Sequence, residues 1–467
     1  MVTDNRAPDN IFRRSHKRWR GRRTRSNHAW RMVIERIVLI STVLALFAPG
    51  TDHAATPILE KAKSAAEFLD SFGINTHIAS ENIGRGISNE TQTRTARELK
   101  YTRMIHVRDD LSIGTHLSTL QALNSLLGVK FDLVYSHYAA DGGSKVVTDD
   151  ISNVQSAADI IEAIEGPNEP DWFGIHYDGI TGAPAVISTQ QLIYSAVKNN
   201  VHLQNVPVYC PGFSYPAPGG LASLVGDLAK YCNYASLHAY VKNVSLGTYL
   251  PYAFLVKWAS FPDTVTAVGR PKVITEGGWH TAINGSTGVD ETTQAKYIPE
   301  YLLDAFNLGI RRTYLYELVD DAADPQMTVE EAHYGVFHFD GTPKPAATVL
   351  ANLNSMLRSE PLTPTSLLYS IDNMPTNGHQ TLLEKSDGTF VLALWNEAEL
   401  WNSTTHVAIP CVGVKVLLHL GAPVPSVQIF DPLVGTAAQQ TSTYVQDLVI
   451  TLLDHPILIF IATKTTR

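Results

Sequence analysis

The stretch DIIEAIEGPNEP, residues 159–170, joins an apolar run to a rigid, proline-containing turn. The run, residues 159–166, has the length and the apolar content of a buried strand. The turn holds an amide, Asn168, beside a carboxylate, Glu169. A buried strand that ends abruptly in polar residues is typical of a parallel sheet covered by helices.

Seven further runs have the apolar and β-branched content of strands. They are residues 71–78, 101–108, 129–137, 206–213, 234–240, 271–278 and 311–318. Helix-patterned segments separate them, for example residues 115–128 and residues 188–203, which Ser188 is expected to cap. Eight strands alternating with helices predict an α/β fold, a (β/α)8 TIM barrel, over residues 56–358, with residues 343–357 as the final helix.

The last part of the chain, residues 359–467, has a different texture. It contains no long helical pattern and consists of short apolar runs separated by turns. Asp387-Gly388 between two such runs is a strong hairpin signal. This pattern predicts a small all-β domain, a β-sandwich, and we expect it to cover apolar barrel surface rather than to bind glycans.

The first part of the chain, residues 1–55, is basic and then apolar. Residues 1–36 contain eleven Lys and Arg and three Asp and Glu, so this segment has a net charge of about +8. The whole chain has a net charge of −9, so the remainder carries about −17. The apolar run 37–48 is shorter than a spanning helix, so it indicates a secretory signal or an uncleaved anchor that starts at Met1 or Met32. We expect a secreted or periplasmic protein whose acidic body binds no nucleic acid and has no membrane partner beyond that anchor.

Three cysteines are too few for a disulfide framework. Cys210 and Cys232 could pair after export, but buried free thiols are the favoured expectation.

Two of the expected strand ends carry a glutamate. Glu169 follows the fourth strand and Glu276 ends the seventh, 107 positions later, which equals three βα units of about 36 residues. Both side chains are therefore expected in one bowl at the C-terminal ends of the strands. Two facing carboxyl groups suit acetal hydrolysis: one protonates the leaving oxygen while the other attacks or stabilises the oxocarbenium-like centre.

GPNEP (166–170) and ITEGGW (274–279) resemble the paired motifs of clan A retaining glycoside hydrolases, the superfamily that includes families 5 and 39. Residues 333–353 resemble the segment that closes the barrel in many of these enzymes, and residues 382–397 the start of their appended β-sandwich. The resemblance extends over roughly residues 70–460. It implies a β-glycosidase without cofactor or metal, acting on a carbohydrate.

The resemblance also implies roles for individual residues. Glu169 would be the general acid/base and Glu276 the nucleophile, with Asn168 on the sugar 2-hydroxyl. An arginine would pair with the nucleophile, and the position of Arg103 within the expected second strand favours it over Arg108. His238 and Tyr240 match the HxY pattern of the sixth strand, with the tyrosine hydroxyl donating to the nucleophile.

Other strand-end residues are candidates for substrate contact. Trp172, Trp279 and Tyr316 could stack on sugar faces; the family usually has tryptophan at the eighth strand, where this chain has Tyr316. His77 is a further candidate beside Asn75 at the end of the first strand. Glu317, Asp320 and Asp321 could bind substrate or a cation, but a solvated acidic face is the favoured interpretation, and no metal-binding motif is present.

Two other functions fit the same residues. A barrel that binds carbohydrate without turnover would show the loss of one glutamate, and both are present. A transglycosylase would use the same two carboxylates and transfer the glycosyl group to a sugar instead of to water.

Overall fold

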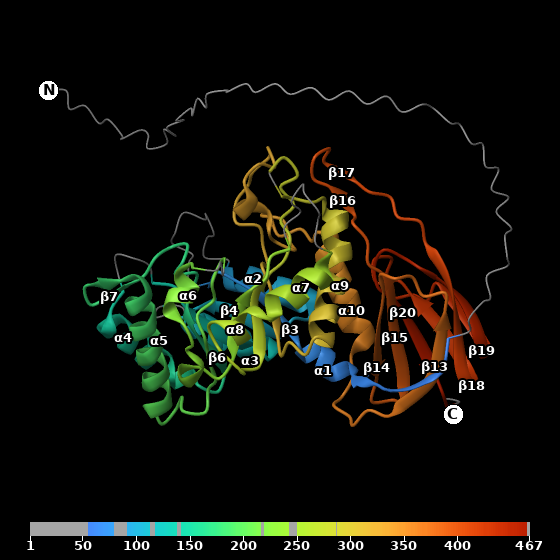
Figure 1. Ribbon diagram of the computed structural model, residues 1–467, viewed down its shortest axis with the longest axis horizontal. Helices are drawn as coiled ribbons and strands as arrows, with labels where there is room; N and C mark the ends of the chain where they lie inside the picture. The colour runs from blue at the N-terminus through green and yellow to red at the C-terminus, as the bar shows by residue number, and fades with distance from the viewer. Residues whose placement is uncertain are drawn as a thin grey trace, which may run out of the picture. The chain divides into compact units, whose positions relative to one another are not determined.

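The structure is a computed structural model that describes residues 55–78, 91–112, 117–137, 142–215, 219–241, 250–285 and 287–464. Its first layer is a parallel sheet of eight strands in the order β10-β11-β12-β3-β4-β5-β6-β9 (Figure 1). The strands are β3 (Phe72–Asn75), β4 (His106–Asp110), β5 (Lys130–Tyr135), β6 (Ile161–Pro167), β9 (Val208–Tyr209), β10 (Ala235–His238), β11 (Lys272–Gly277) and β12 (Thr313–Leu315).

The two ends of this sheet meet and close it into a barrel. Tyr209 of β9 forms a parallel bridge with Tyr234, directly before β10. The backbone N–H of Cys210 donates to the carbonyl of Tyr234 at 2.9 Å, and the N–H of Asn233 donates to the carbonyl of Val208 at 2.6 Å. All eight C-terminal strand ends therefore share one rim.

Helices surround the barrel because their apolar faces pack on its strands. The buried cluster that contains Ile74, Leu133 and Ile164 of the strands also contains Leu99, Leu120 and Ile193 of the helices. These helices are α1 (Ala65–Asp70), α2 (Thr91–Thr102), α3 (Leu117–Leu127), α4 (Ser144–Val154), α5 (Gly182–Asn199), α6 (Leu221–Val225), α7 (Pro251–Ala259), α8 (Phe261–Thr264), α9 (Glu291–Asn307) and α10 (Pro345–Leu357).

Two element boundaries differ most from the sequence-based expectation. The expected strand 101–108 begins in the last turn of α2, and the observed strand β4 covers His106–Asp110 instead. The helix expected over 188–203 begins six residues earlier, at Gly182, so Ser188 lies inside α5 and does not cap it. Short apolar runs at a helix end and at a strand start are alike, so periodicity alone did not separate them.

The second layer is an all-β domain, and the expected barrel followed by a β-sandwich is confirmed. Its sheet has the order β1-β13-β18-β20-β15-β14-β2, with β19 paired to β18. Side chains from β13, β15, β18, β19 and β20 meet in one core, for example Tyr369, Leu392 and Leu418. The strands are β13 (Ser366–Asp372), β14 (Gly378–Glu384), β15 (Thr389–Asn396), β18 (Val414–Phe430), β19 (Gln440–Leu452) and β20 (Ile457–Ala462); β16 (Trp401–Asn402) and β17 (Val407–Ala408) form a separate pair, as do β7 (His176–Tyr177) and β8 (Ile180–Thr181).

The chain enters the described structure through this β domain, which corrects the expected barrel start at residue 56. Strand β1 (Ile58–Lys61) pairs antiparallel with β13, and β2 (Lys63–Ser64) pairs parallel with β14. In Figure 1 the blue N-terminal segment runs beside the orange and red strands. The pairing joins segments about 300 residues apart, so local sequence carries no sign of it.

Strand β15 explains why the β domain packs directly on the barrel. Its alternate residues Val391, Ala393 and Trp395 belong to the barrel's buried cluster, and Phe390 and Leu392 belong to the core of the β domain. A strand buried on both faces in this way lies between two cores. Asp387-Gly388 turns between β14 and β15 as expected, with Gly388 at φ +82°.

Cys210 and Cys232 form a disulfide with their Cα atoms 5.2 Å apart, which corrects the expectation of free thiols. Cys210 directly follows β9, and Cys232 directly follows the 3-10 turn Ala229–Tyr231. Barrel closure brings both sulfurs together, because β9 and β10 are neighbours there.

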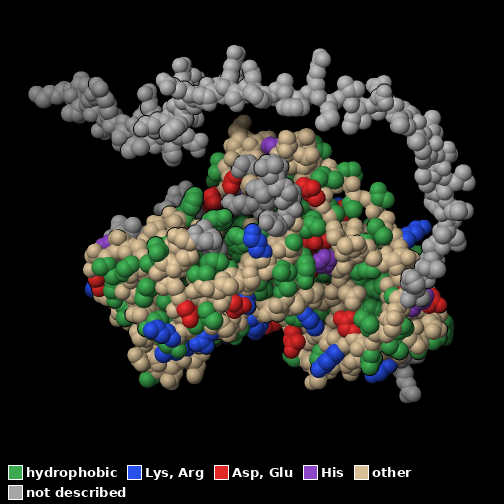
Figure 2. Space-filling view, viewed as in Figure 1, with side chains coloured by type: hydrophobic (Ala, Val, Ile, Leu, Met, Phe, Trp, Pro, Cys, Tyr) green, Lys and Arg blue, Asp and Glu red, His purple; other side chains and the backbone are tan. Residues whose placement is uncertain are grey.

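The expected signal or anchor, residues 1–55 with the run 37–48, lies outside the described residues except for Ala55. Among the residues that are described, no helix has the length and apolarity needed to span a membrane. On the face drawn in Figure 2, acidic and basic side chains are interspersed rather than gathered into patches of one sign.

Candidate active site

Glu169 lies on the turn that follows β6. Its backbone N–H donates to the carbonyl of Gly212 at 2.8 Å, and its own carbonyl accepts from the N–H groups of Trp172 and Phe173. Its φ of +39° is a left-handed conformation that few residues other than glycine adopt. The turn after β6 and the segment after β9 together fix this carboxylate at the rim.

Glu276 is the second carboxylate of the rim, near the end of β11. One oxygen of Glu276, one oxygen of Glu169 and a ring nitrogen of His238 all lie within 4.8 Å of one another. The two glutamates therefore lie close together at one rim of the barrel, as their spacing in the sequence predicts.

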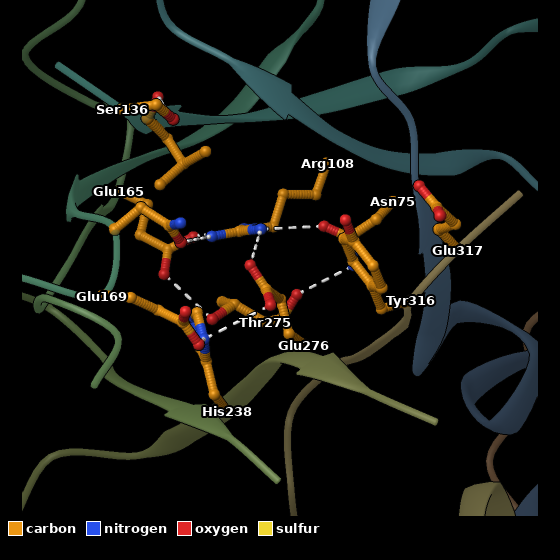
Figure 3. A network of polar contacts seen from close by, with 12 residues as sticks. Asn75, Arg108, Ser136, Glu165, Glu169, His238, Thr275, Glu276, Tyr316 and Glu317 are labelled. Atoms are coloured by element: carbon orange, nitrogen blue, oxygen red, sulfur yellow. Dashed lines mark hydrogen bonds and ion pairs between the residues drawn. The ribbon is translucent and has the colours of Figure 1, made fainter. Parts of the chain in front are cut away.

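Arg108, at the centre of β4, connects the site (Figure 3). Its Nη1 donates to Glu276 Oε1 at 2.8 Å and to Asn75 Oδ1 at 2.8 Å. Its Nη2 donates to Asn168 Oδ1 at 2.9 Å, and its Nε donates to Glu165 Oε2 at 2.6 Å. The guanidinium thus joins side chains from three other strands, β3, β6 and β11, and the turn after β6.

The pKa of Glu276 is lowered despite its burial. Burial by itself would raise this pKa, but the charges of His238 and Arg108 and the hydrogen bonds from Tyr240 and Arg108 outweigh it. The Tyr240 hydroxyl donates to Glu276 Oε2 at 2.7 Å. Glu276 is thereby kept as a carboxylate anion.

His238, the last residue of β10, lies between the two glutamates. Its Nδ1 is 2.7 Å from Glu169 Oε1 and 3.4 Å from Glu276 Oε2. Burial lowers the pKa of this imidazole. The Glu276 charge and the hydrogen bond to Glu169 raise the pKa by more than burial lowers it, so the pKa is raised overall. Its Nε2 lies so close to Gly212 that a Cβ at residue 212 would come within 2.2 Å, so no larger residue fits there.

Three tyrosine rings pack together beside Glu276. The rings of Tyr240, Tyr316 and Tyr334 contact one another at centroid distances of 5.4–6.1 Å in edge-to-face geometry. The Tyr316 hydroxyl is 3.1 Å from His77 Nε2, which is also 2.9 Å from Glu317. His77 and Tyr316 therefore lie at this rim, as expected.

Two of the expected site residues lie elsewhere. Arg103 is exposed on the turn after α2, at φ +60°, because the helix extends farther than expected; Arg108 is the arginine that contacts Glu276. Trp279 is only 3% exposed and stacks on Tyr297 of α9 at 5.1 Å, so it is part of the core and offers no open face for a sugar.

Trp172 is 75% exposed, three residues after Glu169, and is thus open to a ligand beside this glutamate.

The acidic residues after β12 divide into two groups. Asp320 is buried and bound to Lys344 at 2.7 Å, so it is structural rather than part of a solvated face. Glu317 and Asp321 have donor atoms within 4.8 Å of each other and of His77, a spacing that could hold a cation. His77 Nε2 already lies 2.9 Å from Glu317 Oε2 there.

Several residues of the site were missed in the sequence. Glu165 is fully buried at the centre of the network, and its Oε1 accepts from the hydroxyls of Ser236 and Thr275. The signal was present, since Glu165 lies four residues before Glu169 in a mostly apolar strand that has Glu162 as its other charged residue. Tyr334 had no signal, because it lies in irregular chain directly after the 3-10 turn Glu330–His333.

No protein-family model matches this sequence, and no curated protein matches it. Solved structures do. A family 39 glycoside hydrolase from Bacteroides cellulosilyticus WH2 matches with a TM-score of 0.58 at 15% identity, over 85% of this chain and 81% of that one. The GH39 enzyme from Xanthomonas axonopodis pv. citri matches with 0.57 at 12% identity, over 90% and 100%. A GH39 β-xylosidase from Caulobacter crescentus matches with 0.52 at 11% identity, over 86% and 98%.

Each of these matches spans both the barrel and the β domain, since it covers more than four fifths of this chain. The resemblance to clan A glycoside hydrolases is thus confirmed for the fold, and this chain has the architecture of family 39 structures.

Proposed function

We propose that this protein is a retaining glycoside hydrolase that cleaves β-linked oligo- or polysaccharides by double displacement. One observation carries the proposal: oxygens of Glu169 and Glu276 lie within 4.8 Å of each other. Retaining enzymes hold their two carboxyl groups about 5–5.5 Å apart, whereas inverting enzymes need about 6.5–9.5 Å to admit a water. The fold shared with family 39 structures supports the same assignment.

In the first step Glu276 acts as the nucleophile. Its carboxylate forms a bond to the anomeric carbon while the bond from that carbon to the leaving oxygen breaks. Glu169 gives its proton to the leaving oxygen. His238 Nδ1 lies 2.7 Å from Glu169 Oε1; with this nitrogen as the donor, Oε2 is the oxygen that we assign to carry the proton.

In the second step water replaces Glu276 at the anomeric carbon. Glu169, now ionised, takes a proton from the attacking water, and Glu276 leaves as a carboxylate. Arg108 and Tyr240, at 2.8 and 2.7 Å, stabilise the returning charge. Two inversions at the same carbon give net retention.

The sugar contacts are assigned to residues at the rim. Asn168 is anchored through Oδ1 by Arg108, and we assign its amide to the sugar 2-hydroxyl. His77 and Tyr316 line the pocket beside Glu276, and exposed Trp172 offers a stacking face beside Glu169. Polymeric β-glycans are extracellular, which fits the export expected from the basic and apolar N-terminal segment.

The test is a panel of aryl β-glycosides with wild type, Glu169→Gln and Glu276→Gln. Each substitution is expected to lower kcat/KM by roughly three orders of magnitude or more on the preferred substrate. Azide should rescue Glu276→Ala and give a glycosyl azide of inverted configuration. Full activity of either Gln variant, or an inverted sugar product from wild type by NMR, would refute the mechanism. Product analysis at high sugar concentration separates hydrolysis from transglycosylation.

A further inference from the structure

A third carboxylate, Glu165, lies in β6 four residues before Glu169. It is fully buried in β6 and is held from three other strands. Its Oε2 accepts from Arg108 Nε of β4 at 2.6 Å. Its Oε1 accepts from Ser236 of β10 at 2.7 Å and from Thr275 of β11 at 2.9 Å. Three hydrogen bonds thus hold Glu165 in one position, and the roles described above do not use it.

Arg108 is shared between two anions. Its Nε faces Glu165 and its Nη1 faces Glu276, at 2.6 and 2.8 Å (Figure 3). The side chains of the arginine and of Glu165 are 4% and 0% exposed, so water screens neither charge. Burial lowers the pKa of Arg108, but the charges of Glu165 and then of Glu276 raise it well above its usual range.

We propose that Glu165 is a positioning residue, the resident counter-ion of Arg108 that compensates this buried cation whenever Glu276 is consumed as a glycosyl ester. The inference rests on the proposed function, because only a covalent step at Glu276 removes its charge. When the ester forms, Arg108 loses one of its two anions. A buried cation without a partner is strongly unfavourable, and Glu165 prevents that state.

Glu165 also acts on the free enzyme. With Glu165 in place, Arg108 divides its charge between two carboxylates, and the Glu165 anion itself opposes a second anion nearby. Both effects keep Glu276 more basic than Arg108 alone would leave it. Removing the Glu165 charge should therefore lower the pKa of Glu276 further and make it a weaker nucleophile.

Asp132 of β5 provides a matched control. It is paired in register with Arg108, is fully buried, and neither of its oxygens has a hydrogen-bond partner among the described residues. Burial raises its pKa well above the usual range, the Glu165 charge adds to this and the Arg108 charge opposes it, so the net direction favours the neutral acid. Asp132→Asn thus removes a buried carboxyl group near Arg108 without removing a charge.

The experiment compares pH profiles of kcat/KM and pre-steady-state bursts for wild type, Glu165→Gln and Asp132→Asn on an activated aryl β-glycoside. For Glu165→Gln we expect the acid limb, which reports Glu276, to move down by on the order of one pH unit. We also expect a loss in kcat/KM of about a hundredfold and loss of the burst, because the ester is destabilised. Asp132→Asn should keep the wild-type acid limb and burst.

The inference would be overturned by a Glu165→Gln variant that folds and is slow but has the same acid limb of kcat/KM as wild type. Glu165 would then contribute only to packing. If that variant does not fold, Ser236→Ala replaces it. Without this hydroxyl, Glu165 depends more on Arg108, which then attracts Glu276 less, so the acid limb should move up by a few tenths of a unit. An unmoved limb would again overturn the inference. Inactivity of wild type on every glycoside would instead refute the proposed function.

Discussion

Two buried clusters of carboxyl groups in this molecule have opposite electrostatics. In the barrel site, Glu276 faces Arg108 and its pKa is lowered. At the contact between α9 and the β domain, burial raises the pKa of Asp304 to about 6, against the opposing effect of His379. The pKa of Glu300 beside it is raised well above its usual range by burial and by neighbouring carboxylates.

The difference lies in which cation faces each acid. In the barrel site the cation is the buried guanidinium of Arg108, which donates hydrogen bonds to four acceptors. The interface has Lys296, which binds Asp454 at 2.7 Å, and His379, which lies 3.0 Å from Asp304 and 3.5 Å from Glu397. Neither oxygen of Glu300 has a hydrogen-bond partner among the described residues. Burial decides the protonation of an acid unless a fixed charge opposes it.

The largest expected effect comes from removing the arginine of the barrel site. Arg108→Gln leaves Glu165 buried without a cation and leaves Glu276 with His238 alone, so the free energy of unfolding should fall by about 3–5 kcal/mol. The pKa of Glu276 should rise, which would move the acid limb of kcat/KM upward, opposite to the shift expected for Glu165→Gln. Urea unfolding and a pH profile measure the two effects. An unchanged acid limb would mean that Arg108 does not set the ionisation of Glu276.

The interface should respond to pH through His379. Its pKa is raised from 6.5 to about 9, because Asp304 and Glu397 outweigh the lowering effect of burial. The stabilisation from this imidazolium is therefore fully present below about pH 6.5 and is lost as the pH rises through 9. Urea unfolding at pH 6, 7.5 and 9 should show wild type and His379→Gln converging with rising pH. A constant difference across this range would contradict the assignment.

A smaller effect is expected at Glu300. Because the pKa of Glu300 is raised in the folded state, this side chain must take up a proton when wild type folds at neutral pH, which costs free energy. A glutamine at residue 300 takes up no proton. Glu300→Gln should increase the free energy of unfolding at pH 7 by on the order of 1 kcal/mol, with the gain vanishing below about pH 4. A loss of stability at every pH would show that Glu300 is ionised and partnered in the fold.

The smallest effect is expected for Arg103→Gln, the matched control for Arg108. Arg103 is exposed and has a left-handed backbone conformation. Glutamine, like arginine, is not β-branched, so the substitution adds no backbone strain at this position. Activity should be unchanged and the free energy of unfolding should change by no more than about 0.5 kcal/mol. A large loss of activity would show that Arg103 contributes to the active site.

Much of the fold was predictable because the barrel is built from local patterns. Most of the barrel strands are short, mainly apolar runs, and the turn chemistry of Asp387-Gly388 gives the β14–β15 hairpin directly. The errors fall where two patterns adjoin. At residues 101–108 a helix end and a strand start share one apolar stretch, and this ambiguity alone moved the arginine of the site from Arg108 to Arg103.

The sequence by itself determined the alternation of strands and helices and the placement of Glu169 and Glu276 at two strand ends, since both follow from periodicity and spacing. Tertiary structure alone decided the rest. Pairing of β1 with β13, burial of Trp279 against α9 and the disulfide between Cys210 and Cys232 depend on segments that meet only after folding. The same holds for Glu165, whose role depends on charges from other strands, and electrostatic interactions follow distance in space rather than position along the chain.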